Sequence, residues 1–261
     1  MKIGLITTRK KGDGQGSVMV KVAQRLAEHG HSLEPIYPDE NLLDVGNCKA
    51  EYSLYILKAG TPAAMELAAT LDAAGARILN PYDAVVKIKS KVLSSRLLSD
   101  AGVGVPDAYV VNDPHALKPL AEREPLVLKP LFGGSQGRGV KIVRTAAELP
   151  ESNGEALFVQ SWHEPDGRDH KMYRIADKVF GVRRVWPAKT LQDKLGEAFE
   201  PPKEMIDITL KCGEPFGVDL YGLDIVVSKG KPYVVDVNSF PGFKGVPDAG
   251  RHLADYIMEK L

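Results

Sequence analysis

The feature that most constrains the fold is a pair of apolar segments near the C-terminus that are interrupted by acidic residues. Residues 219–228 (DLYGLDIVVS) and 232–237 (PYVVDV) are joined by Lys229-Gly230-Lys231, a sequence typical of a hairpin turn. Asp224 interrupts the first segment and Asp236 the second. Pairing of the two strands can bring the carboxylates together, so the sequence predicts an antiparallel hairpin with acidic groups on one face.

A third oxygen-bearing side chain belongs to the same face. Asn238 follows Asp236 by two positions and therefore projects from the same side of its strand. Such a face makes a poor core but suits a hard cation, because Mg²⁺ binds one or two carboxylates together with phosphates and water. The sequence predicts metal binding by Asp224, Asp236 and Asn238. The alternative is that Asn238 caps the following turn and the aspartates face solvent.

The N-terminal third has the pattern of a small parallel sheet covered by helices. Val18, Val22 and Leu26 recur every four residues and predict one helical face, which Gly30 ends. Pro62 opens a second apolar helix that ends near residue 75. Strands are expected at 2–7, 33–37 and 52–57. This β-α-β-β-α order favours an α/β lobe.

The rest of the chain alternates short helices with strands. Helices are expected at 89–101, near 113–114, from 201 to about 212 and at 247–260. Strands are expected at 107–111, 126–131, 139–143, 157–162, 169–176 and 178–186. The predicted fold class is α/β with α+β lobes. We expect a first lobe at 1–86, a central lobe at 87–160 and a C-terminal lobe at 161–261.

Composition excludes several classes of protein. The 261 residues include 34 basic and 34 acidic side chains, and this balance argues against a general nucleic-acid binder. Cys48 and Cys212 have neither disulfide nor zinc spacing. No apolar run approaches the ~20 residues of a membrane span, and the first one is too short for a signal peptide. We therefore expect a cytoplasmic protein that binds neither nucleic acid nor membranes.

A glycine-rich segment at 132–139 (FGGSQGRG) lies between two predicted strands. Glycines let the backbone approach an anion closely, and Ser135 and Arg138 add a hydroxyl and a charge. No Gly-Lys-Ser/Thr follows, so this is not a P-loop, and an ordinary hairpin loop is the alternative. Lys129 interrupts the preceding apolar strand, which favours an anionic partner unless its side chain reaches solvent at the strand edge. Lys91 is a weaker candidate of the same kind.

Three further groups of residues could contact substrates. Basic residues in the predicted hairpin at 169–186 could neutralise charge that develops during phosphoryl transfer. Basic residues near strand ends of the first lobe could form an acceptor pocket, and amides of the turn at 239–246 (SFPGFKGV) could meet a phosphoryl group. Solvated faces and a plain turn are the alternatives. The residues are Lys171, Arg174, Arg183 and Arg184; Arg9, Lys10, Lys11 and Lys58; and Gly242 and Lys244.

In this order the motifs resemble the ATP-grasp superfamily. They are Lys91 on a helix, VLKPLFGGSQGRGV, FVQSW, DHK before an Arg-Arg pair, LDIV and DVNSFPG. The resemblance covers about 85–248, and the first lobe is similar to the Rossmann-like pre-ATP-grasp domain. The glycine loop and DHK resemble RimK-type carboxylate–amine ligases, which usually carry glutamate at the place of Asp236. DVNSFPGFKGV is also similar to inositol polyphosphate 5/6-kinases, which place a substrate-binding lysine where Lys58 stands.

The resemblance implies roles for these motifs. ATP would be bound by Lys91, Lys129, Ser135, Gln136, Gly137, Gly139, Gln160, Ser161 and Trp162, with Glu164 or Asp166 at the ribose. Asp224, Asp236 and Asn238 would hold one or two Mg²⁺ ions, with Mn²⁺ as a possible substitute. Lys171 and Arg183 would lie near the γ-phosphate and an acyl phosphate. Arg9, Lys58, Arg184, Gly242 and Lys244 would contact the acceptor.

Three functions remain as hypotheses. The first is an ATP-dependent ligase, in which a carboxylate attacks the γ-phosphate and an amine then attacks the acyl phosphate. The second is a small-molecule kinase of the inositol polyphosphate kinase type. The third is a non-catalytic nucleotide-binding module, which the complete metal set disfavours. The partners expected are small-molecule or peptide carboxylate and amine substrates, and a homo-oligomer is possible.

Overall fold

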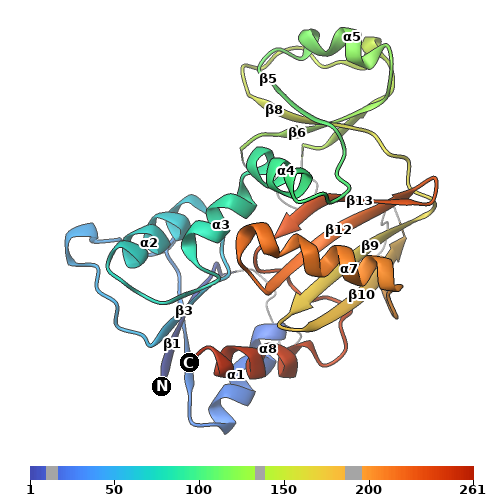
Figure 1. Cartoon of the computed structure of the whole chain (residues 1–261). Coiled ribbons are helices and arrows are strands. Elements are labelled where there is room, and N and C mark those ends of the chain that lie inside the picture. Colours follow the sequence, from blue (N-terminus) through green and yellow to red (C-terminus); the bar gives the residue numbers. More distant parts are fainter. Residues whose placement is uncertain (10–16, 133–138, 186–195) are drawn as a thin grey trace.

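The computed structural model describes residues 1–9, 17–132, 139–185 and 196–261 and shows three sheets flanked by helices (Figure 1). The strand orders are β2-β1-β3-β4, β5-β8-β6-β7 and β11-β10-β9-β12-β13. This mixed α/β architecture confirms the predicted fold class. Of the described residues, no helix has the length and apolar character needed to cross a bilayer.

The first sheet is parallel, as the β-α-β-β-α pattern predicts. It contains β1 (Lys2–Ile6), β2 (Ser32–Ile36), β3 (Leu54–Leu57) and β4 (Ile78–Leu79). Its helices are α1 (Val18–Glu28) and α2 (Pro62–Ala73), with the short turn η1 (Val45–Asn47). Thr61 caps α2 by accepting a hydrogen bond from the Ala64 N–H, and Pro62 lies in the first turn. The two-residue β4 is too short to leave a pattern in the sequence.

The helix predicted at 89–101 is present, and a second helix that the sequence analysis did not predict precedes it. They are α3 (Tyr82–Lys89) and α4 (Lys91–Asp100). Ser90 divides them: its backbone is extended, and its hydroxyl accepts a hydrogen bond from the Leu93 N–H at the start of α4. The division places Lys91 in the first turn of α4, where its side chain can reach the central sheet.

The central sheet is antiparallel. It contains β5 (Ala108–Val111), β6 (Leu126–Pro130), β7 (Lys141–Val143) and β8 (Leu157–Ser161). The short helices η2 (Pro114–Leu117), α5 (Lys118–Ala121) and η3 (Ala146–Glu148) accompany it. Leu117, Ala121, Leu126, Leu128, Val143 and Val159 form its own small core. Because the sheet has a separate core, it can hold residues of β6 and β8 against another part of the molecule.

The largest sheet is also antiparallel and is covered on one face by α7 (Lys203–Cys212). Its strands are β9 (Arg168–Ile175), β10 (Lys178–Val185), β11 (Glu197–Phe199), β12 (Leu220–Ser228) and β13 (Lys231–Asn238), and η4 (Glu214–Phe216) precedes β12. Met172, Leu223 and Ile225 face α7 and pack with Met205 and Cys212. Side chains of alternate residues therefore project from the opposite face, which α7 leaves uncovered.

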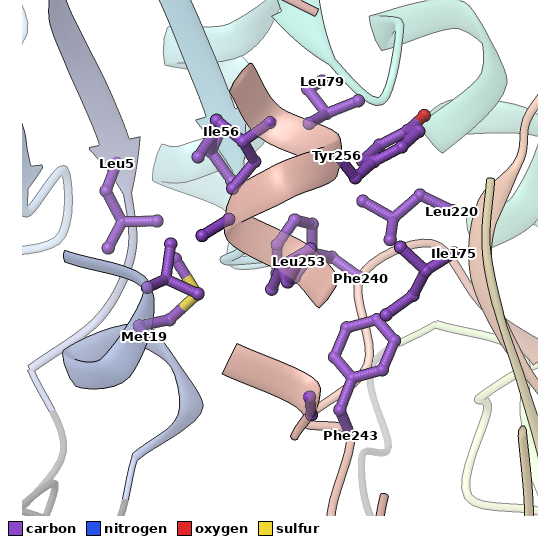
Figure 2. Packing of buried hydrophobic residues seen from close by; sticks show 14 of the residues in the cluster. Leu5, Met19, Ile56, Leu79, Ile175, Leu220, Phe240, Phe243, Leu253 and Tyr256 are labelled. Carbon is purple, nitrogen blue, oxygen red and sulfur yellow. The ribbon is translucent and has the colours of Figure 1, made fainter. Parts of the chain in front are cut away.

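The C-terminal helix α8 (Ala249–Glu259) packs on the first lobe as well as on the largest sheet. Figure 2 shows Leu253 and Tyr256 of α8 between Leu5 and Ile56 of the first sheet and Ile175 of β9. The terminal residues extend this contact, since the Arg77 guanidinium donates to the carbonyl oxygens of the last two residues. One hydrophobic core thus spans both ends of the chain, and the domain boundaries at 86 and 160 stay predictions.

Candidate functional site

Three strands of the largest sheet bring the predicted hairpin residues into one row. Asp224 of β12 lies directly opposite Asp236 of β13 and, on its other side, directly opposite Lys171 of β9. Residues that are paired across antiparallel strands share a face, so all three project away from α7. Asp169 lies two positions before Lys171 and belongs to the same side. We call this side the carboxylate face, defined by Asp169, Lys171, Asp224 and Asp236.

The charges on the carboxylate face depend on one another. Lys171 Nζ donates to the Asp224 carboxylate in a short ion pair. Asp236 is exposed at the surface of the sheet, yet the protein atoms that surround its carboxylate desolvate the charged form. This burial, together with the charge of Asp224, raises the pKa of Asp236 to about 6, against the opposing effect of Lys129. The carboxylates of this face therefore repel one another even with the lysines nearby, and a bound cation would reduce this repulsion.

Lys129 reaches this face from the central sheet. Its Nζ donates to Gln160 Oε1 at 2.7 Å and to the Val235 carbonyl oxygen at 3.1 Å. Burial lowers the pKa of Lys129, while the carboxylates of Asp236 and Asp224 raise it. The lysine that interrupts an apolar strand in the sequence thus lies beside the predicted metal ligands, as the anion argument requires.

An irregularity in β13 makes the Lys129 contact possible. After Asp224 pairs with Asp236, Ile225 pairs with Val234, so Val235 is an extra residue in the ladder. A bulge of this kind releases a backbone group from regular pairing. The freed carbonyl of Val235 accepts the hydrogen bond from Lys129. The sequence pattern V-V-D-V does not reveal which residue will bulge.

Lys91 approaches from α4. Its Nζ donates to the Leu131 carbonyl oxygen at 3.4 Å, and its charge acts on both Lys129 and Asp236. A cavity of about 20 Å³ lies between α4, β6, β8 and β13 and is lined by Lys91, Lys129 and Asp236, among other residues. This volume accommodates about one water molecule. This cavity is too small to hold a triphosphate.

A larger cavity lies elsewhere. It has a volume of about 700 Å³ and lies between α7, the loop at 102–104 and the start of β13. None of the residues that the sequence singled out for chemistry lines it. Its size therefore does not outweigh the convergence of charged groups at the carboxylate face.

Asn238 ends β13 opposite Gly222. Its Oδ1 accepts a hydrogen bond from the Phe240 N–H at 3.0 Å, which is the turn cap that the sequence offered as the alternative to metal binding. A side-chain amide oxygen has two lone pairs, so this cap leaves one of them for another partner. The described residues contain no group of three His, Cys, Asp or Glu side chains arranged around one metal position. Two carboxylates and one amide oxygen suit Mg²⁺, which completes its shell with phosphate and water.

The structure separates the two arginines of the Arg-Arg pair, and this corrects the pairing of Arg183 with Lys171. Arg183 lies opposite His170 on the side that α7 covers, and its guanidinium stacks over the Phe199 ring at 5.0 Å. Arg184 lies opposite Asp169 on the carboxylate face, and its Nη2 donates to the Tyr173 hydroxyl at 3.4 Å. Neighbouring residues of a strand point in opposite directions, so only one of the two can serve this face.

The two residues predicted to contact the ribose, Glu164 and Asp166, differ in their contacts. Both carboxylate oxygens of Asp166 accept backbone N–H groups, from Lys229 at 3.0 Å and from Gly230 at 2.9 Å. These bonds lower the pKa of Asp166 and fix the turn between β12 and β13. Asp166 therefore acts as a clamp of this turn, and its role at the ribose stays a prediction. Glu164 is exposed and makes no such contact among the described residues.

The strand predicted to meet adenine has its N–H groups in use. The Ser161 N–H donates to the Asp107 carbonyl oxygen and the Trp162 N–H to the Pro125 carbonyl oxygen. The Gln160 side chain is buried and holds Lys129. Gln160 therefore acts through the lysine, and a base in this region would have to use carbonyl oxygens of the strand or groups that follow it.

The remaining predicted residues lie in several places. Arg9 pairs with Glu40 at 3.1 Å and stacks over Tyr37, so it is engaged within the first lobe. Lys58 Nζ lies 5.0 Å from the centre of the Phe240 ring, next to the turn that follows β13. Gly139, Gly242 and Lys244 are exposed. Lys10, Lys11, Ser135, Gln136, Gly137 and Arg138 lie outside the described residues.

Two residues of the carboxylate face were missed by the sequence analysis. Burial, together with the nearby Asp224, raises the pKa of Asp169 to about 6, while Lys171 and Arg184 oppose the shift. Tyr173 follows Lys171 by two positions and accepts the hydrogen bond from Arg184. The period of two along D-H-K-M-Y would have identified both, because Asp169, Lys171 and Tyr173 occupy alternate positions.

Comparison with known proteins identifies this arrangement. The model of the RimK-like ATP-grasp domain matches residues 88–261. A probable alpha-L-glutamate ligase of Parasynechococcus marenigrum (strain WH8102) is 27% identical in an alignment of 207 positions that covers 73% of this chain and 44% of that protein. The chain thus spans less than half the length of this relative.

Solved structures share the fold. A RimK domain ATP-grasp protein from Sphaerobacter thermophilus DSM 20745 superposes with a TM-score of 0.74 at 18% identity, covering 99% of this chain and 100% of that one. The ATP-grasp ligase PsnB, complexed with a minimal precursor, Mg and ADP, gives a TM-score of 0.70 at 18% identity over 99% of this chain and 97% of PsnB. These similarities confirm the predicted ATP-grasp fold.

Proposed function

Because this chain belongs to the RimK-like ATP-grasp family, we propose that it is an ATP- and Mg²⁺-dependent carboxylate–amine ligase. The observation that carries the proposal is the row Lys171–Asp224–Asp236, which faces Lys129 from a different sheet. A metal-bound triphosphate requires oxygen ligands for the metal beside cationic groups for the phosphates, and here the cationic groups are Lys91 and Lys129.

Each residue has a proposed task. Lys91 and Lys129 bind phosphate oxygens, and Gln160 and the Val235 carbonyl hold Lys129 in place. Asp224, Asp236 and Asn238 provide oxygen ligands for one or two Mg²⁺ ions, with Mn²⁺ as a substitute. Lys171 and Arg184 stabilise negative charge at the transferred phosphoryl group. Glu164 or Asp166 contacts the ribose, and Lys58 and Lys244 contact the acceptor.

When bound, Mg-ATP supplies an electrophilic phosphorus: a substrate carboxylate oxygen attacks it and ADP leaves. An amine then attacks the acyl carbon, and inorganic phosphate leaves. The protein provides position and charge, so no side-chain nucleophile is required. Lys171 forms an ion pair with Asp224 on this face, so its ammonium group would lie beside a metal held by Asp224 and Asp236 and could stabilise negative charge on the phosphoryl group.

The substrates are proposed as a class. The relative from Parasynechococcus is described as a probable alpha-L-glutamate ligase, and PsnB was also solved in complex with the precursor peptide PsnA2 and AMPPNP. We propose that this chain joins a small-molecule or peptide carboxylate to an amine, with amino acids such as glutamate as the first candidates.

A product assay tests the proposal. Wild-type protein is incubated with ATP, Mg²⁺ and pooled carboxylates and amines, and mass spectrometry follows the products. An amide together with released phosphate supports a ligase. Phosphate retained on a substrate would show a kinase, and absence of any turnover despite ATP binding would show a binding module. Asp236→Ala should lose turnover, whereas Asp207→Ala, a change on the exposed side of α7, should keep it.

A further inference from the structure

A buried amide of the first lobe contacts the metal-binding hairpin. The Asn80 side chain is 2% exposed, and its Nδ2 donates to the Leu220 carbonyl oxygen at 2.7 Å and to the Ser239 carbonyl oxygen at 2.7 Å. Asn80 follows β4 directly, whereas its two acceptors belong to the largest sheet. A buried amide that satisfies two carbonyls is a demanding arrangement, since removal of the donor leaves both oxygens without partners.

The two acceptors mark the open end of the hairpin. Leu220 begins β12, and Ser239 follows Asn238, the last residue of β13. The other end is closed by the turn that Asp166 clamps. Strand ends without a connecting turn tend to separate, so Asn80 performs at the open end the function that Asp166 performs at the closed end.

The first lobe holds the same segment at a second point. Lys58 lies over the ring of Phe240, and Phe240 in turn donates its N–H to Asn238 Oδ1. Phe240 is buried in the core that α8 shares with the first sheet. The backbone from Asn238 to Phe240 is thus held between contacts from the first lobe.

We infer that Asn80 is a positioning residue for the metal site: it fixes the end of β13 so that Asn238 presents its oxygen beside Asp236. The inference rests on the proposed function, because it assumes that Asn238 is a metal ligand. Groups that orient metal ligands from outside the coordination shell typically change metal affinity by about 10- to 100-fold when they are removed. Asn80 touches neither substrate nor metal and acts through the Ser239 carbonyl.

The test measures metal binding without turnover. Mn²⁺ binding is followed by electron paramagnetic resonance in the presence of adenylyl imidodiphosphate, for wild type, Asn80→Ala and Asn80→Ser. Asn80→Ala should weaken Mn²⁺ binding by about 10-fold. Asn80→Ser keeps one hydrogen-bond donor, so its Mn²⁺ affinity should lie between those of Asn80→Ala and the wild type. Nucleotide binding measured without metal should not change in either variant.

A matched variant separates position from general stability. Thr209→Val removes a fully buried hydroxyl that donates to the Met205 carbonyl oxygen at 2.7 Å within α7, on the other side of the sheet. It should lower the melting temperature and leave Mn²⁺ affinity unchanged. Amide hydrogen exchange at residues 238–243 of the metal-free protein should be faster in Asn80→Ala than in wild type or Thr209→Val.

The outcomes distinguish the two ideas. Unchanged Mn²⁺ affinity in folded Asn80→Ala, or in Asn80→Ser where the alanine variant does not fold, would overturn the positioning role and leave the proposed function intact. If wild-type protein binds nucleotide with no dependence on Mn²⁺, the proposed function fails, and the inference fails with it. A loss of Mn²⁺ affinity equal to that in Thr209→Val would also overturn it, because the effect would then be one of stability.

Discussion

Side-chain direction decides which of two adjacent arginines can act. Arg184 lies on the carboxylate face with Lys171, while Arg183 is held over Phe199 on the side covered by α7. The sequence motif identifies the pair but not the member, since register is required to know which residue points where. The sequence is therefore enough to predict a strand that carries basic residues, but it does not show which of the two arginines points to the carboxylate face.

The arginine pair gives the first prediction. Arg184→Ala should lower kcat on the order of 100-fold, because it removes a charge that stabilises the transferred phosphoryl group. Arg184→Lys should retain part of the rate. Arg183→Ala should keep a kcat close to wild type. Steady-state kinetics with saturating Mg-ATP measures all three, and a larger loss in Arg183→Ala than in Arg184→Ala would contradict the assignment.

The pKa of Asp236 gives the second prediction. Burial raises the pKa to about 6, so the metal-free folded state binds this proton more tightly than the unfolded state does. The stabilising contribution of the protonated group is full below about pH 4 and is lost as the pH rises through 6. At pH 7 without metal, Asp236→Asn should therefore have a free energy of unfolding roughly 1 kcal/mol above that of the wild type, after allowance for solvent screening. Its melting temperature should be higher accordingly.

Metal binding should show the opposite trend with pH, since the carboxylate must lose its proton to become a ligand. Mn²⁺ affinity of the wild type should fall as the pH is lowered through 6. Thermal melts at pH 5 and pH 7 with and without Mn²⁺ measure both effects. If metal-free Asp236→Asn melted at a lower temperature than the wild type at pH 7, the ionised Asp236 carboxylate would not be destabilising the folded state.

At the scale of elements, the hairpin β12–β13 shows what a sequence can and cannot predict. The apolar strands and the turn follow from the period of two, whereas the pairing of Asp224 with Asp236 depends on the bulge, since in the register set by the turn Asp224 would lie opposite Val235. The bulge itself could not be predicted, because the V-V-D-V pattern does not mark which residue leaves the ladder. Helix α3 was missed, and the helix predicted from residue 89 begins at Lys91, because the role of Ser90 as the cap of α4 is visible only in the structure.

The turn clamp gives the third prediction. Asp166→Ala removes both acceptors of the turn N–H groups, so the β12–β13 turn should exchange its amide hydrogens faster and the protein should melt a few degrees lower at pH 7. Because the pKa of Asp166 is lowered, the stabilisation is present above the ordinary pKa near 3.8 and disappears as the pH falls through the folded value.

Glu164→Ala serves as the control for the Asp166 experiment, because this carboxylate is exposed and makes no turn contact among the described residues. Hydrogen exchange at residues 228–231 should be unaffected by it. If Asp166→Ala changed ATP affinity while the exchange at the turn stayed the same, Asp166 would be a ligand contact and the clamp assignment would be wrong.

At the scale of the whole molecule, the C-terminal helix joins the ends of the chain. The amphipathic pattern at 247–260 predicts that one face of a helix is buried, and the structure confirms the helix. The pattern carries no information on the partner surface, which proves to be both the first sheet and the largest sheet. Partners that are distant along the chain are set by topology, which is why the three-part domain division could not anticipate this contact.

This contact gives the fourth prediction. Leu253 is fully buried between the two sheets, and Leu253→Ala should destabilise the protein by about 2–5 kcal/mol. The exposed Arg251→Ala is the matched control on the same helix and should be close to wild type. Urea unfolding monitored by circular dichroism measures the difference. A loss below about 1 kcal/mol for Leu253→Ala would show that α8 contributes little to the shared core.

The bulge at Val235 has a consequence beyond the lysine that it serves. β13 is an edge strand of its sheet. A regular edge strand with unpaired backbone groups can pair with a strand of a second molecule. Here the Val235 carbonyl is taken by Lys129, and the Val234 N–H donates to the Gly104 carbonyl oxygen. Two backbone groups at this edge are thus already paired within the chain, which disfavours the addition of a strand from a second molecule at this point.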